Sequence, residues 1–226
     1  MKNHRLEKSA ASLLLLGLLL AFAGCATSGY RTNERTAKTL DSLANRIELA
    51  GAQMDIAVTE LNNLVNNPQP DLRPQFNRFS AAVNKLESLA SSVQKADTDL
   101  QARGKTHFES WDKEVTTIQN EVIRSNAQAR KLEVLGRFNN LRNNCLTVLT
   151  GYSPVQSDLR DTQRFLNSDL TLGGLAAIKD TASRVTQQAT PVRDSVSKLV
   201  AEMKSVAVAV SPHNGVTAVS TNSPSK

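Results

Sequence analysis

Apolar residues recur every seven positions through most of this chain, and this spacing constrains its fold more than any other feature. Two such rows run side by side in the N-terminal third, and a pair of rows with this spacing forms one apolar face of an α-helix. The first row is Leu40, Ile47, Met54 and Leu61, and the second is Ala44, Gly51, Val58 and Val65. Aromatic residues make up only 4% of the chain, whereas strands favour aromatic and β-branched residues. The sequence therefore predicts an all-α protein with long helices.

Proline, glycine and capping residues divide the repeat into separate helices. The first predicted helix covers about residues 32–67, because the proline at position 68 cannot continue it. The second covers about 71–103, with Asp71 as its N-terminal cap and Gly104 as its C-terminal stop.

A third predicted helix, residues 106–170, is about twice as long as the others. Thr106 and Glu109 have the spacing of a capping box at its start. Its apolar rows change phase near residues 132–135, which indicates a rotation of the apolar face. The rows then keep their phase across Pro154, which favours a kink there over a break, although a new helix starting at this proline is the alternative.

The last predicted helix covers residues 174–210, starting at the second of two adjacent glycines, and is expected to kink at Pro191. At 1.5 Å per residue the third helix would be about 95 Å long and the others about 50–55 Å. The first two helices would then pack on one half of the third, and the last helix on its other half. The expected architecture is an elongated antiparallel coiled coil or helical bundle over residues 32–210. The alternative is a compact bundle broken at Pro154.

Residues 1–24 predict a secretory signal, since a basic start, an apolar run and small residues follow one another in the order of such signals. The end of this segment resembles the lipobox of bacterial lipoproteins, in which the chain is cut before a cysteine whose thiol is acylated. The lipobox residues are Phe22, Ala23 and Gly24, followed by Cys25. A plain signal peptide, cut near Ala23 or Ala26, is the alternative.

The lipobox resemblance implies that the mature chain is attached to a membrane through two or three acyl chains on Cys25. Each buried CH₂ group of such chains adds about 0.8 kcal/mol of membrane affinity. Residues 25–31 would be a linker from the lipidated cysteine. Because Ala26, rather than an aspartate, follows Cys25, the resemblance favours the outer membrane, with the protein facing the periplasm.

The remaining cysteine and the C-terminal tail have simpler interpretations. Cys145 falls in an apolar row, so we expect a buried, inert thiol, with a dimer-forming thiol as the alternative. Residues 211–226 are rich in Ser, Thr and Asn and are expected to be disordered.

Several short segments resemble a family of bacterial helical lipoproteins of unknown function, DUF2959. The resemblance covers roughly residues 30–208, and the family implies no activity, cofactor or catalytic residue. The segments that carry it are Phe108-Glu109-Ser110-Trp111 with Glu114, Tyr152-Ser153-Pro154-Val155, Leu159-Arg160-Asp161, Phe165-Leu166-Asn167, Leu170 and Ala177-Ile178. The chain departs from the family pattern at Ser168-Asp169 and Thr171–Gly174, where similar proteins continue their helix.

No group of residues in the sequence predicts catalysis. His107 lies near Glu109 and Trp111, but one histidine does not make a metal site. Nucleic-acid binding is not expected, because the chain carries few stacking aromatic residues and a secretion signal. We therefore expect no enzyme, cofactor, metal or small-molecule substrate.

Two functions fit these observations. The first is a lipid-anchored scaffold of the cell envelope that binds a protein partner or associates with itself. The second is a module that holds a lipid or another apolar ligand between its helices.

Overall fold

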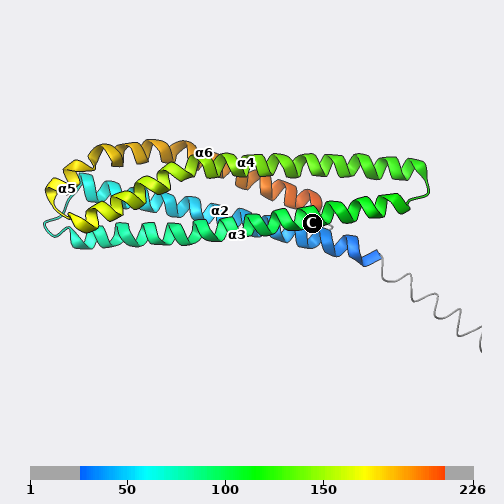
Figure 1. The fold of residues 1–226 in the computed structure, drawn as a ribbon, viewed down its shortest axis with the longest axis horizontal. Helices are drawn as coiled ribbons and strands as arrows, with labels where there is room; N and C mark the ends of the chain where they lie inside the picture. Colours follow the sequence, from blue (N-terminus) through cyan, green and yellow to red (C-terminus); the bar gives the residue numbers. More distant parts are fainter. Residues whose placement is uncertain (1–25, 212–226) are drawn as a thin grey trace, which may run out of the picture.

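The computed structural model describes residues 26–211, all of its regular structure is helical, and Figure 1 shows an elongated bundle. The prediction of an all-α helical bundle is confirmed. The signal sequence, the lipobox, Cys25 and residues 212–226 lie outside the described residues. The helices are α2 (Ala26–Asn66), α3 (Arg73–Thr117), α4 (Glu121–Ser168), the short α5 (Leu172–Ala177) and α6 (Lys179–Val210).

The four long helices form a ring in which each packs against two others. α2 contacts both α3 and α6, and α4 contacts the same two helices from the other side. At one end of the bundle lie the α2–α3 loop and α5, and at the other end the hairpin of α3 and α4 extends past the end of α6 (Figure 1). The bundle is therefore four helices thick over most of its length, and thinner at the hairpin.

The first predicted row of α2 is buried throughout, and the second is buried at Ala44 and Val58 and partly buried at Gly51 and Val65. All of Leu40, Ile47, Met54 and Leu61 are buried, and a further row of buried residues, which includes Leu43, Ala57 and Leu64, lies beside them. The apolar face of α2 is this wide because it serves two neighbours, α3 and α6, at once.

The buried apolar side chains form two clusters along the bundle axis. One cluster, nearer α5, includes Phe79, Leu86, Leu159 and Leu166. The other, nearer the start of α2, includes Leu40, Leu141 and Met203. The core is therefore divided into two parts.

The predicted single helix over residues 106–170 is wrong. The chain reverses at residues 118–120, so that α3 and α4 have similar lengths of 45 and 48 residues. Asn120 caps α4, because its side chain accepts a hydrogen bond of 3.1 Å from the Ile123 backbone N–H. Thr106 lies inside α3, where its hydroxyl donates to the Ala102 carbonyl, and does not form a capping box.

Gly104 does not end a helix either, and its role is packing. It is buried inside α3, and a Cβ added to it would overlap the Phe138 ring of α4 and lie 2.9 Å from Cε2. α3 continues because the row that contains Ala90 extends in phase through Gly104 and Trp111 to Ile118.

The phase change near residues 132–135 was predicted to be a rotation of the apolar face within one helix, but it has a different cause. Val115 belongs to α3, whereas Val122 and Leu132 follow the chain reversal and are 69% and 65% exposed on α4. From Val134 onward α4 enters the bundle, and the rows predicted for its second half are buried or partly buried. The two phases belong to two antiparallel helices.

Neither internal proline breaks its helix, in agreement with the favoured prediction, whereas other boundaries differ from it. α4 continues through Pro154 and α6 through Pro191, and Figure 1 shows the C-terminal half of α4 inclined to its N-terminal half. The segment predicted as one helix over 174–210 is divided into α5 and α6. Thr171 caps α5 by accepting from the Gly174 N–H (3.1 Å), and a Cβ on Gly174 would overlap the Asp169 carbonyl oxygen. The predicted linker over residues 25–31 is helical from Ala26.

Alanine substitution of two glycines tests the packing of α3 against α4. Nothing lies within 4 Å of a Cβ at Gly136, so Gly136→Ala is expected to raise the free energy of unfolding by about 0.5–1 kcal/mol. In Gly104→Ala the same gain is opposed by the cost of displacing the Phe138 ring. We therefore expect the free energy of unfolding to fall by about 1–2 kcal/mol. Urea unfolding measures both changes, and an equal gain in both variants would contradict the packing.

Candidate functional site

The predicted lipidation site precedes the first described residue. Cys25, Phe22, Ala23 and Gly24 lie outside the described residues, but α2 begins at Ala26, directly after Cys25. A group attached to Cys25 would therefore be joined to a 41-residue helix of the bundle rather than to a linker.

Contacts between α2 and α3 fix which residues lie at the same level along the bundle. Because the two helices are antiparallel, residues at the same level have numbers with a constant sum. Arg46 contacts Ser92 and Glu60 contacts Arg78, and the sum is 138 for both pairs. The Gln53 side chain donates to the Ala82 carbonyl (3.1 Å), a pair whose numbers add to 135. The start of α2 at Ala26 therefore lies level with about residues 109–112 of α3, and the α3–α4 turn extends beyond that level.

A cavity lies in the middle of the bundle, at the boundary between the two core clusters. It encloses about 60 Å³ of free space, and its walls include Ile47 from α2, Val93 from α3 and Val196 from α6. α4 contributes Cys145 and Tyr152. The site is almost wholly apolar, so it suits a small apolar group.

The two polar side chains that α4 places in this cavity are held in their neutral forms. Burial, together with the carboxylates of Asp97 and Glu202, raises the pKa of the Cys145 thiol to about 12. Burial also raises the pKa of Tyr152, whose buried hydroxyl has no hydrogen-bond partner among the described residues. Cys145 is buried, which confirms the prediction of a buried thiol. A thiol with so high a pKa is a poor nucleophile at neutral pH.

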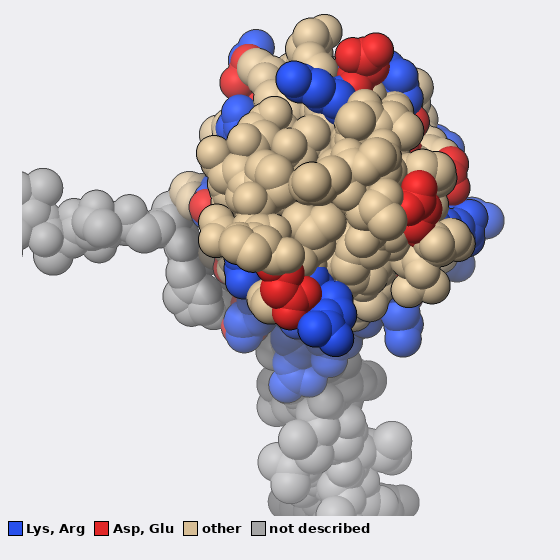
Figure 2. All heavy atoms as spheres, turned by 90° about the vertical axis from the view of Figure 1, so that its left-hand side faces the viewer, with Lys and Arg blue, Asp and Glu red and all other residues tan. Residues whose placement is uncertain are grey.

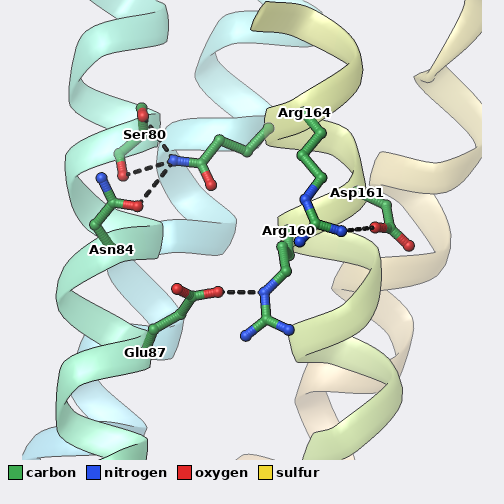
Figure 3. A network of polar contacts seen from close by, with 7 residues as sticks. Ser80, Asn84, Glu87, Arg160, Asp161 and Arg164 are labelled. Carbon is green, nitrogen blue, oxygen red and sulfur yellow. Dashed lines mark hydrogen bonds and ion pairs between the residues drawn. The ribbon is translucent and has the colours of Figure 1, made fainter.

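Polar contacts join α3 and α4 on the α5 side of the cavity (Figure 3). The Gln163 side chain donates to the Ser80 hydroxyl at 2.7 Å and to Asn84 Oδ1 at 3.0 Å. Arg160 forms an ion pair with Glu87, half-buried between the helices. Each of these contacts links two helices of the same chain, and their partial exposure limits the stability that each contributes. Sequence reasoning missed this network, because none of its members falls on an apolar row.

His107 lies in an aromatic cluster near the hairpin. Its ring contacts Phe108 and Trp111 edge-to-face, with ring centroids 5.3 and 5.5 Å apart, and Phe108 contacts Phe138 in the same way. Burial lowers the pKa of His107. Within residues 26–211, no group of three or more His, Cys, Asp or Glu side chains is placed to hold a metal ion.

The end of the bundle that carries α5 presents few charges. Figure 2 shows this end as a largely uncharged surface with acidic and basic residues around its edge. Leu172 of α5 and Phe165 of α4 are the exposed large apolar residues of this region, 67% and 40% exposed. Among the helices that the structure describes, none has the length and apolarity needed to cross a bilayer.

Comparison with known proteins identifies a family for this chain. A family model described as "Protein of unknown function (DUF2959)" matches residues 23–211. No curated protein and no solved structure matches the chain.

The thiol of Cys145 provides a test of the core around the cavity. In a Cys25→Ser variant, where Cys145 is the single thiol, we expect its thiolate fraction at pH 8 to be about a thousandfold lower in the folded protein than in denaturant. Reaction with a thiol reagent should be slower by a similar factor. The unfolded chain loses this proton near pH 9 and the folded chain near pH 12, so stability should fall as the pH rises through this window. A labelling rate in the folded protein that levels off near pH 9 would contradict this burial.

Proposed function

The chain belongs to the DUF2959 family, whose description names no activity, and from that premise we propose that it is a lipid-anchored scaffold of the cell envelope. In this proposal Cys25 carries the lipid, the helical bundle projects from the membrane as a rod, and the far end of the rod binds a protein partner. The proposed location is the outer membrane, facing the periplasm, because Ala26 rather than an aspartate follows Cys25.

The observation that carries the proposal is the continuity between the anchor and the rod. α2 is helical from Ala26, the first described residue, which directly follows Cys25. Its 41 residues extend about 60 Å at 1.5 Å per residue. Its other end lies beside α5, where the surface is largely uncharged (Figure 2). With the rod upright on the membrane, a lipid on Cys25 would place this end about 60 Å from it. Such a geometry suits a protein that presents a binding surface at a fixed height.

The proposal includes no catalysis. The polar side chains that meet within the bundle, such as Gln163 with Ser80 and Arg160 with Glu87, join α3 to α4. The Cys145 thiol is protonated and buried at neutral pH. These groups have structural roles that account for their positions.

The cavity favours a second function, the binding of a small apolar ligand. Its free space of about 60 Å³ is less than half of the roughly 150 Å³ that holds benzene in an engineered protein cavity. An acyl chain would fit only if the helices around the cavity moved apart, and this requirement ranks the second function below the first. A small molecule that co-purifies with the protein in native mass spectrometry would reverse the ranking.

Substitution of the two cysteines tests the lipid anchor. Cys25→Ser is expected to move the protein from the membrane fraction to the soluble fraction of the envelope, because the acylated thiol is lost. Cys145→Ser is the matched control and should stay in the membrane fraction, since Cys145 is buried in the bundle. Mass spectrometry of the N-terminal peptide should give the mass of an acylated Cys25. Equal fractionation of the two variants, without an acylated peptide, would contradict the anchor.

Site-specific photo-crosslinking in cells tests the binding surface at the far end. A photoreactive residue at Leu172, on α5, is expected to give one discrete protein adduct. A photoreactive residue at Ile56, an exposed apolar position on the side of α2, should give none. Adducts from both positions, or from Ile56 alone, would place the partner elsewhere on the rod and refute this part of the proposal.

A further inference from the structure

The turn between α3 and α4 exposes apolar side chains at the end of the bundle opposite α5. Val122 and Ile123, in the first turn of α4, are 69% and 56% exposed. Ile118, the first residue of the turn, is partly buried. Large apolar side chains at the tip of a projecting hairpin are costly to leave in water unless another surface covers them.

This tip, defined as residues 118–123, lies at the same end of the bundle as the start of α2. Ala26 is level with about residues 109–112 of α3, according to the contacts between α2 and α3. Ile118 is six to nine residues further along α3, which corresponds to about 9–14 Å at 1.5 Å per residue. Figure 1 shows the same arrangement, with the α3–α4 turn extending beyond the start of α2.

We propose that the tip inserts into the lipid leaflet that holds the acyl chains of Cys25, so that the rod has two points of attachment to one membrane. This inference rests on the proposed lipidation of Cys25. If Cys25 lies at the membrane surface, a tip that reaches about 9–14 Å further along the same axis places Val122 and Ile123 near the boundary between headgroups and acyl chains. Apolar faces of interfacial helices lie about 5–10 Å deep at the same boundary.

Several backbone groups of the tip already have partners within the hairpin, and at this depth the exposed Glu121 side chain would lie at the level of the headgroups. The Ile123 N–H donates to the Asn120 side chain (3.1 Å), and the Ile118 N–H donates to the Val115 carbonyl (3.2 Å). The Ile118 carbonyl accepts from Arg124 Nη1 at 3.3 Å. These bonds lower the cost of moving the turn out of water.

The charges around the tip favour a lipid surface over a charged protein partner. Lys131 is paired with Asp112, and Lys105 lies 3.9 Å from Glu109. Nearer the tip, Lys113, Glu114, Glu121 and Arg124 are also mixed in sign. This part of the hairpin therefore gives a partner no strong field of one sign. A tip held beside the membrane by Cys25 also needs little affinity of its own, since the anchor raises its effective concentration there.

A polarity-sensitive thiol dye at two matched positions tests the inference. Val122→Cys and Leu172→Cys replace apolar residues that are 69% and 67% exposed at opposite ends of the rod. Both are made in the full-length lipidated protein, in which Cys145 is buried, and the protein is reconstituted into vesicles of phosphatidylethanolamine and phosphatidylglycerol. We expect several-fold stronger, blue-shifted emission at position 122, quenched by brominated lipids, and emission typical of water at position 172.

A further variant and two side measurements separate the possible outcomes. Adding Ile123→Asp to the Val122→Cys protein should abolish the lipid quenching while the protein still floats with the vesicles. Lipidated, floating protein with the same emission at positions 122 and 172 would overturn the inference and leave the anchor intact. Emission at position 122 that changes only when envelope proteins are added would overturn it in favour of a protein partner. Loss of flotation together with an unmodified Cys25 would instead refute the proposed function.

Discussion

The wide apolar face of α2 is the constraint on which the rest of the bundle depends. Because buried residues such as Leu43 and Ala57 lie beside the main row of Leu40, Ile47, Met54 and Leu61, α2 can pack against α3 and α6 at the same time. α4 then has one remaining place, between α3 and α6 and opposite α2. The ring of four helices thus follows from one helix that needs two neighbours.

Small residues at one level explain why the core divides in two. Gly51 of α2 approaches Val196 of α6, where an added Cβ would lie 3.0 Å from the valine Cγ1. Gly151 of α4 approaches Val192 of α6 in the same way, at 3.3 Å. These close approaches bring α6 near both α2 and α4. On α3, the small side chain of Ala90 fills less of the space at the same level. The cavity lies at this level, and the Gln163 and Arg160 contacts hold α3 to α4 next to it.

Much of the helix packing could be predicted from the sequence, because a seven-residue repeat reports directly on burial. The residues of the rows predicted for α2 and for the second half of α4 are buried or partly buried. The turn at residues 118–120 was missed, because it contains neither proline nor glycine and its signal is the single cap Asn120. Gly104 misled the prediction, since a glycine that ends a helix and one that admits a neighbouring ring look alike in a sequence.

Polar contacts between distant segments were also beyond the sequence. Gln75 is buried, and its amide donates to the Asn63 and Asn67 carbonyls at 3.2 and 2.9 Å. Its Oε1 accepts from the Gln69 N–H at 2.8 Å. One side chain thus satisfies the end of α2 and the loop that follows, a role that no local pattern indicates. The candidate sites differ in the same way. The lipobox is a local pattern that a sequence shows, whereas the cavity and the tip depend on how the helices pack.

The position of the turn at residues 118–120 also has consequences for orientation. If α3 ended at Gly104, as a helix stop there would require, nothing of the hairpin would extend beyond the start of α2. Because α3 continues to Thr117, the hairpin passes the level of Ala26 by about 9–14 Å. A lipid on Cys25 alone would let the rod pivot about one point, whereas a second contact beside it would limit that rotation. The packing of Gly104 against Phe138, which allows the two helices to remain close past this level, is therefore the link between the core of the bundle and its proposed orientation on the membrane.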